Sequence, residues 1–244
     1  MNQDFQPSTP DSSGARTPIS SPYYCTPEEI EHYHMLREQY RKFAGKEPWE
    51  ESTFSTRDLL DPLNGITLDL RSPEHRLIVE LMDLPILQRL KDIYQVGGAY
   101  AVYKEAGHRR FDHAIGSGIL AMRAMENLRR YAQGQAASQL DEFKLAVVAA
   151  AILHDAGHIA PRSHMAEHLW FPLEKGAHER MTQRIISADQ GLRFVMHGYQ
   201  PDLFDLTLKI LREDPKLPIW TWKLISGGGW NVDRGDWTYR DSMH

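Results

Sequence analysis

The sequence has little of several features that mark other classes of protein. Its 244 residues include one cysteine, Cys25, so no disulfide can form within the chain, and a reducing compartment is indicated. No hydrophobic run reaches the roughly 20 residues that a membrane-spanning helix needs. The first residues also lack the apolar stretch of a secretory signal peptide. We therefore expect an intracellular protein, cytoplasmic or nuclear, with no membrane partner.

An excess of basic charge is also missing. The 28 Lys and Arg residues are outnumbered by 33 Asp and Glu residues, and the formal net charge of -5 does not favour nucleic acid as a partner. The chain has no Gly-x-Ser-x-Gly nucleophile motif. Its glycine run at 227–229 lacks the Lys and Ser/Thr of a phosphate-binding P-loop. A serine hydrolase and a P-loop nucleotidase are therefore not indicated.

Composition changes along the chain and predicts three parts. Residues 1–25 are rich in Ser, Pro, Thr and Gly, which is typical of a disordered tail. Residues 26–55 open with a capping box and predict an N-terminal helix followed by a linker. The globular domain is expected over 56–244, and we expect it to be truncated at its C-terminal side.

The globular part has a helical pattern with little strand. Residues 66–70 alternate in polarity and predict a short β-hairpin. A helix is expected from Pro73 to Met82, and another from Pro85 to the glycine pair at 97–98. Apolar periodicity predicts more helices, at 114–131, 141–154, 174–189, 202–213, 216–226 and from 231 onward. The expected fold is therefore an all-α helical bundle with a possible N-terminal β-hairpin.

The unusual feature of the bundle is the pair His154-Asp155. The helix KLAVVAAAILHD is apolar nearly all round, so it belongs in the centre of the bundle and ends there in two polar side chains. A buried carboxylate is costly unless it is paired or bound to a metal. His113 and Asp233 lie in two other predicted helices and could complete a site of two imidazoles and two carboxylates. That donor set suits a divalent Mn, Fe, Co, Zn or Mg ion.

Several strings resemble one family in their order and spacing. HRRFDHAIGSGILA, AAILHDAGH, AHER and NVDRGDWTYRDS are similar to the HD-domain superfamily of metal-dependent phosphohydrolases, and within it to the deoxynucleoside triphosphate triphosphohydrolases. The likeness extends back to DPLNGITLDL and LPILQRLKDIYQVGGAY. It implies a nucleotide substrate, hydrolysed to nucleoside and triphosphate, a divalent metal cofactor, and assembly into homo-oligomers.

The resemblance also assigns roles to residues. It implies that the metal is held by His113, His154, Asp155 and Asp233. It implies a catalytic role, in proton transfer or in contact with phosphate, for a second set: His158, His164, His178 and Glu167, the last orienting His164. It implies contacts with the nucleoside, the phosphates or the sugar for a third set: Gln95, Val96, Arg110, Arg234, Trp237 and Asp241.

The chain departs from the family's pattern in places, and these departures keep two alternatives open. The stretch before His164 is one residue longer than usual, and Trp237 stands where a Tyr is common. The family also continues beyond the last motif. One alternative is a different HD-domain phosphodiesterase or nucleotidase. The other is an inactive HD-fold protein, or a fragment, that binds or scaffolds.

Overall fold

The computed structural model describes Met35, residues 56–59, Leu63 and residues 65–102, 107–158 and 176–242. The tail predicted at 1–25 lies outside these residues, and so does the helix and linker predicted at 26–55, apart from Met35, which is helical. Among the described helices, none is both long and apolar enough to cross a membrane.

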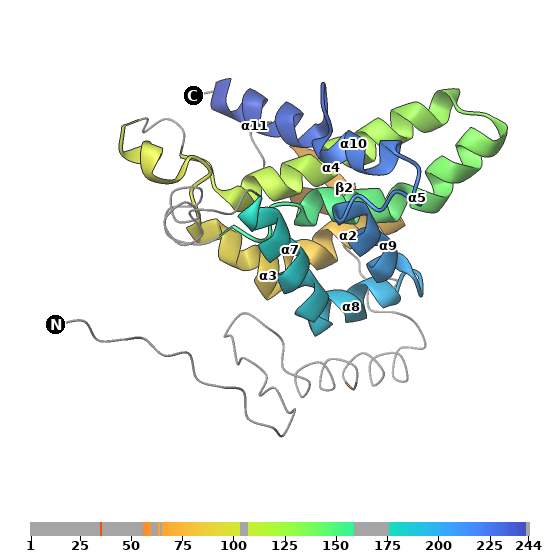
Figure 1. The fold of residues 1–244 in the computed structure, drawn as a ribbon, viewed down its shortest axis with the longest axis horizontal. Helices are drawn as coiled ribbons and strands as arrows, with labels where there is room; N and C mark the ends of the chain where they lie inside the picture. Colours follow the sequence, from red (N-terminus) through yellow and green to blue (C-terminus); the bar gives the residue numbers. More distant parts are fainter. Residues whose placement is uncertain are drawn as a thin grey trace.

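The described chain is mainly helical with one small sheet, as Figure 1 shows. Strands β1 (Thr56–Leu59) and β2 (Ile66–Asp69) pair antiparallel, with Thr56 opposite Asp69 and Leu59 opposite Ile66. The helices that follow are α2 (Pro73–Met82), α3 (Pro85–Gln88), α4 (Arg110–Tyr131), α5 (Gly134–Leu153), α7 (Ala177–Ala188), α8 (Gln190–His197), α9 (Leu203–Leu211), α10 (Trp220–Ser226) and α11 (Val232–Ser242). The predicted all-α fold with a short N-terminal hairpin is confirmed.

Helices α4 and α5 form the centre of the bundle. They pack against each other along their length, α11 packs on α4, and α9 packs on α5 (Figure 1). Every residue from 145 to 153 is buried, because this half of α5 is surrounded by other helices. Gly118 of α4 permits close contact, since a Cβ at this position would overlap the side chain of Ile152. The apolar helix predicted from the sequence is therefore the core helix, and its end lies inside the molecule.

The helix expected between Pro85 and the glycine pair is shorter than predicted. Helix α3 ends at Gln88, a 3₁₀ turn continues to Asp92, and a second 3₁₀ turn covers Gly97–Ala101. Between these turns the chain is extended at Ile93 and pairs at Tyr94 with Arg109, directly before α4. The carbonyl of Ile93 accepts a hydrogen bond from the amide of Arg110 at 2.9 Å. This non-local pairing replaces the helix and brings the QVGG segment beside the start of α4.

Helix α8 was not predicted. It begins at Asp189, whose side chain caps the helix by accepting a hydrogen bond from the amide of Leu192 at 2.9 Å. Gly191 lies in its first turn and is buried. A glycine in this position weakens the helical pattern in the sequence, so the local sequence does not indicate this helix.

Candidate metal centre

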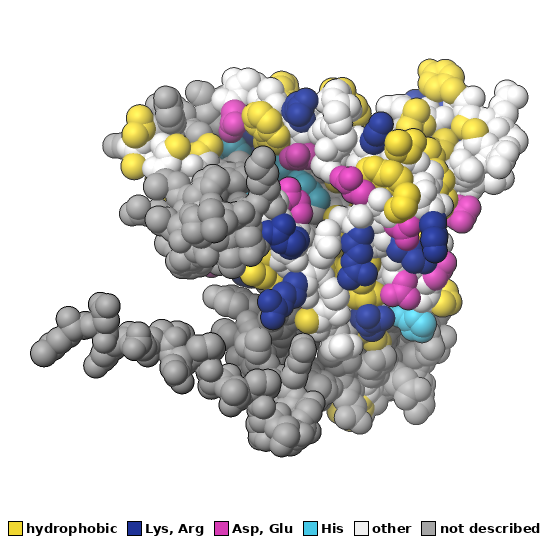
Figure 2. All heavy atoms as spheres, viewed as in Figure 1, with side chains coloured by type: hydrophobic (Ala, Val, Ile, Leu, Met, Phe, Trp, Pro, Cys, Tyr) yellow, Lys and Arg dark blue, Asp and Glu magenta, His cyan; other side chains and the backbone are white. Residues whose placement is uncertain are grey.

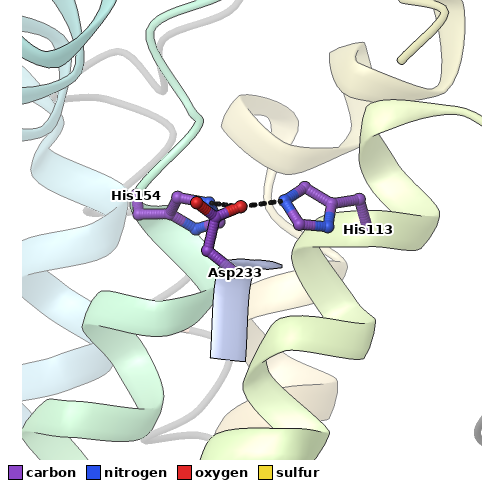
Figure 3. Close-up of side chains that lie close together, drawn as sticks. All are labelled: His113, His154 and Asp233. Atoms are coloured by element: carbon purple, nitrogen blue, oxygen red, sulfur yellow. Dashed lines mark ion pairs between the residues drawn. The ribbon is translucent and has the colours of Figure 1, made fainter. Parts of the chain in front are cut away.

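Three segments far apart in the sequence meet at one point. His113 comes from the first turns of α4, His154 from the residue after α5, and Asp233 from the first turn of α11. Figure 3 shows the carboxylate of Asp233 between the two imidazole rings. Its Oδ1 atom lies 3.2 Å from Nε2 of His113 and 3.5 Å from Nε2 of His154. These three residues form a group that could hold a metal ion.

Asp155 borders the same point. Its Oδ1 lies 3.5 Å from Nε2 of His154, and its Oδ2 lies 3.8 Å from Nε2 of His113. Both polar residues can face inward because α5 ends at Leu153 and the chain turns there. The hydroxyl of Thr182 holds this turn, since it donates to the carbonyl of His154 at 3.0 Å and accepts from the amide of Gly157 at 2.7 Å.

The side chains present fit a divalent cation. The Nε2 atoms of His113 and His154 are buried and have no hydrogen-bond partner. A buried polar atom without such a partner is costly and calls for an explanation. Two imidazole nitrogens and two carboxylates provide a donor set that suits Mn, Fe, Co, Zn or Mg. His113, His154, Asp155 and Asp233 are the residues that would hold the ion.

Electrostatics at the centre favour a proton where a metal would bind. Burial opposes the charged form of His154, but the carboxylates of Asp155 and Asp233 outweigh burial and raise the pKa of His154 to about 9. Burial acts against ionised Asp233 as well, but the neighbouring imidazoles of His113 and His154 hold the pKa of this carboxyl below its usual range. In the metal-free protein, protonated imidazole therefore balances the carboxylates, and a divalent cation would displace that proton.

A second group of side chains adjoins the first through Asp155. His158 and His178 stack with their ring centroids 4.4 Å apart, and Nε2 of His158 lies 3.4 Å from Oδ1 of Asp155. Burial lowers the pKa of His158 to about 4, so its ring is neutral at pH 7. The guanidinium of buried Arg110 pairs with Oδ2 of Asp155 and donates to the carbonyl of Gln95 at 3.3 Å. Metal-ligating geometry is also possible for Asp155, His158 and His178.

The centre opens into a pocket of about 510 Å³. His154, Asp155 and Asp233 line this pocket together with His178 and Glu179 from the first turn of α7. Other lining residues lie at the end of α9, directly after it, or in α10: Ile210, Leu211, Arg212, Glu213, Trp222, Ile225 and Ser226. On the face shown in Figure 2, acidic and histidine side chains lie together, with several Lys and Arg side chains nearby.

The other residues singled out from the sequence lie apart from this pocket. Gln95 and Val96 are partly buried in the segment that pairs with the start of α4, and Oε1 of Gln95 is buried without a hydrogen-bond partner. On α11, Arg234 is exposed, Trp237 is partly buried, and Oδ1 of Asp241 lies 3.7 Å from Nε2 of His108. None of these five lines the pocket as the described residues form it. His164 and Glu167 lie outside the described residues.

Two buried residues of α11, Asp236 and Arg240, were not among the predicted site residues. Oδ2 of Asp236 lies 2.8 Å from Nδ1 of His113, and Nε of Arg240 donates to the same oxygen at 2.7 Å. Their spacing held a signal, because positions 233, 236 and 240 fall on one face of a helix. A polar stripe that continues from a candidate ligand could therefore have identified them.

Comparison with known proteins agrees with this geometry. The HD domain family model matches residues 110–219, which include His113, His154 and Asp155. The chain is 30% identical over 214 residues to deoxynucleoside triphosphate triphosphohydrolase SAMHD1 of Bos taurus, which covers 75% of this chain and 35% of that protein. With SAMHD1 of Homo sapiens the identity is 31% over 212 residues, covering 75% of this chain and 32% of that protein. The chain spans about a third of the length of these relatives.

A solved structure has a similar fold. The crystal structure of a hypothetical protein from Aquifex aeolicus superposes with a TM-score of 0.59 and 28% sequence identity. The match covers 77% of this chain and 46% of that one. The family match includes the His154-Asp155 pair, and the fold brings that pair together with His113 and Asp233. Residues 110–219 of the chain therefore match the HD domain in sequence, and the described residues around His154-Asp155 have a geometry that agrees with this match.

Proposed function

We propose that the chain is a metal-dependent phosphohydrolase that converts deoxynucleoside triphosphates to deoxynucleoside and triphosphate. The observation that carries the proposal is the meeting of His113, His154, Asp155 and Asp233, with two buried imidazole nitrogens that lack hydrogen-bond partners. The substrate class is supported by the relatives, whose names describe deoxynucleoside triphosphate triphosphohydrolases.

The residues around the centre would have different roles in such a reaction. A bound divalent cation would act as a Lewis acid toward a phosphoryl oxygen and promote the ionisation of an attacking water. Arg110 is fixed by Asp155 and the carbonyl of Gln95, and its planar guanidinium suits phosphate oxygens. His158 is neutral, so its role is to donate a hydrogen bond to the phosphate.

Proton transfer to the leaving oxygen is assigned to His178, with His164, oriented by Glu167, as the other candidate from the sequence. His178 lies in the pocket wall, and its side chain is 23% exposed, so a substrate in the pocket can reach it. A positioned imidazole typically contributes about 10²- to 10⁴-fold to such a step. Arg234, Trp237, Asp241, Gln95 and Val96 are proposed to contact the remainder of the nucleotide.

Product analysis tests this function. The purified protein would be incubated with each deoxynucleoside triphosphate and Mn²⁺ or Mg²⁺, and the products separated by anion-exchange chromatography. We expect deoxynucleoside and triphosphate in equal amounts, and no product from Asp155→Ala. Release of phosphate or pyrophosphate instead would contradict the proposed cleavage position. Hydrolysis of cyclic nucleotides or nucleoside monophosphates alone would identify a different HD-domain phosphohydrolase.

A further inference from the structure

A buried carboxylate lies directly behind one of the candidate metal ligands. Oδ2 of Asp236 is 2.8 Å from Nδ1 of His113, and both side chains are completely buried. The other ring nitrogen of His113, Nε2, faces Asp233 at 3.2 Å and makes no hydrogen bond. The ring therefore has a partner for one nitrogen and presents the other toward the candidate metal centre.

Arg240 fixes the position of that carboxylate. Its side chain is 3% exposed, and its Nε donates to Oδ2 of Asp236 at 2.7 Å, one helical turn along α11. Two nitrogen atoms, Nδ1 of His113 and Nε of Arg240, thus converge on a single carboxylate oxygen. The guanidinium offsets the charge of a carboxylate that water cannot reach, which makes the arrangement tolerable inside the bundle.

Helix α4 leaves room for this pair at Gly116. A Cβ at this position would overlap both Oδ1 of Asp236 and Nη2 of Arg240. Gly116 lies one turn after His113 on the same helix, so the absence of a side chain lets the pair sit against α4 close to the imidazole. The contact between α4 and α11 is therefore shaped around a charged pair and does not consist of apolar side chains alone.

We propose that Asp236, held by Arg240 in the space left by Gly116, is the positioning residue that keeps the proton of His113 on Nδ1 and so directs the Nε2 lone pair to the metal. A ligating imidazole commonly donates its other N–H to a carboxylate, which fixes the tautomer and raises the basicity of the ligand. Because Asp233 lies on the same helix face, one contact between α4 and α11 aligns two of the four ligands. The inference rests on the metal site of the proposed function.

Metal affinity gives the first test. Co²⁺ binding would be titrated by calorimetry for the parent, Asp236→Asn and the double variant Asp236→Asn/Arg240→Gln. The double variant replaces the charged pair by a neutral pair of similar shape, so it leaves no buried charge without a partner. We expect Co²⁺ affinity to fall by about 10- to 100-fold in both variants. Parent-like affinity in the double variant, with its folding verified by circular dichroism, would overturn the proposal.

Two control variants separate positioning from general damage. Asp141→Asn removes the carboxylate of a surface pair whose Nε to Oδ1 distance is also 2.7 Å, and it should leave Co²⁺ affinity unchanged. Gly116→Ala displaces the buried pair, whereas Gly118→Ala on the same helix overlaps Ile152. We expect only Gly116→Ala to weaken Co²⁺ binding by tenfold or more, and equal losses in the two glycine variants would contradict the inference.

Paramagnetic NMR of the Co²⁺-loaded protein gives a readout that a merely structural role would not change. His113 and His154 should each show a shifted, exchangeable Nδ1–H signal. In each ring Nδ1 faces an oxygen at 2.8 Å, which is Oδ2 of Asp236 for His113 and the carbonyl of Ala151 for His154. In Asp236→Asn we expect the His113 signal to exchange faster with solvent and the His154 signal to remain. Identical behaviour of both signals in parent and variant would refute the proposal.

The metal-affinity and NMR measurements do not depend on whether the protein hydrolyses nucleotides. If the parent binds Co²⁺ and the variants bind it weakly, the positioning role holds even where no nucleotide is hydrolysed. If the parent hydrolyses nucleotides and the variants keep parent-like Co²⁺ affinity and NMR signals, the proposed function holds and the positioning role fails.

Discussion

Two Asp–Arg pairs at opposite ends of α4 have the same contact distance and very different surroundings. Nε of Arg240 lies 2.7 Å from Oδ2 of Asp236 near the start of α4, and Nε of Arg129 lies 2.7 Å from Oδ1 of Asp141 at its far end. The first pair is 3% and 0% exposed, whereas the second is 48% and 57% exposed. The contact distance alone therefore does not determine how much either pair contributes to the stability of the fold.

The two pairs differ in how far water can solvate their charges. Around Arg129 and Asp141, water solvates each charge whether or not the pair forms, so the contact contributes little. Around Asp236 and Arg240, each charge depends on the other, and an apolar pair of similar size would often be as stable. The presence of a charged pair in the bundle is accounted for by the third group it touches, the imidazole of His113. The following predictions test this contrast, from the largest expected effect to the smallest.

The largest expected effect is the loss of metal affinity when a candidate ligand near the start of α4 is removed. His113→Ala deletes one of four donors, so we expect Mn²⁺ affinity to fall by more than the roughly 100-fold that loss of an outer partner can cause. Nucleotide hydrolysis should fall to background at the same time. Titration of Mn²⁺ by electron paramagnetic resonance checks the first part, and retention of micromolar binding would show that the ion is held elsewhere.

Loss of the carboxylate should destabilise the fold for the buried pair near the start of α4 and not for the exposed pair at its far end. Asp236→Asn removes the buried carboxylate charge that Nε of Arg240 contacts, and we expect the free energy of unfolding to fall by about 3 to 5 kcal/mol. Asp141→Asn removes an exposed partner and should leave the free energy of unfolding nearly unchanged. Urea unfolding of the metal-free proteins, followed by circular dichroism, measures both, and similar losses in the two variants would invalidate the contrast.

Metal addition should stabilise every variant that keeps the centre. At a metal concentration 100 times the Kd, the gain is about 2.7 kcal/mol, because the ion binds the folded state alone. Parent and Asp141→Asn should show the same rise in melting temperature with Mn²⁺ and the same fall with a chelator. The melting temperature of His113→Ala should change neither with Mn²⁺ nor with a chelator. Scanning calorimetry with and without the ion measures these shifts, and a parent-like rise in His113→Ala would contradict the prediction.

The pH dependence of metal binding should follow the protonation of His154. Its pKa of about 9 lies above the ordinary value of 6.5, so the protonated ring stabilises the metal-free protein below pH 6.5, and this stabilisation is lost as the pH rises through 9. The ion competes with that proton, so affinity should rise about tenfold per pH unit from 6.5 to 9 and then level off. Calorimetry in buffers of different ionisation enthalpy would detect the released proton, and a pH-independent affinity would contradict this account.

Elements with a strong local pattern were predictable from the sequence. The apolar residues 145–153 predict a core helix, and the helix ends in His154-Asp155 as expected. The bounds of α2 also agree with the prediction, because Pro73 defines the start of this helix. The ends of α3 and the start of α8 were not predicted, since a backbone pairing in one case and a capping aspartate in the other override the local preference.

The candidate ligands could be chosen from the sequence with the help of family resemblance, and the polar stripe of α11 marks Asp236 and Arg240, but the contact of Asp236 with His113 could not be predicted. His113 and Asp236 are 123 residues apart, and nothing in the local pattern of either residue indicates that their side chains meet. The space at Gly116 has meaning only once α11 is placed on α4. Contacts of this kind depend on tertiary packing, which is why candidate ligands could be named from the sequence and the residues in contact with them could not.

The most direct test of the central claim is the Mn²⁺ titration of the purified protein beside His113→Ala and Asp233→Asn. The account predicts saturable binding by the parent, in a one-to-one ratio, and strongly weakened binding by both variants. Binding of equal strength in all three proteins, or no binding by the parent, would contradict the claim that these side chains hold a metal ion.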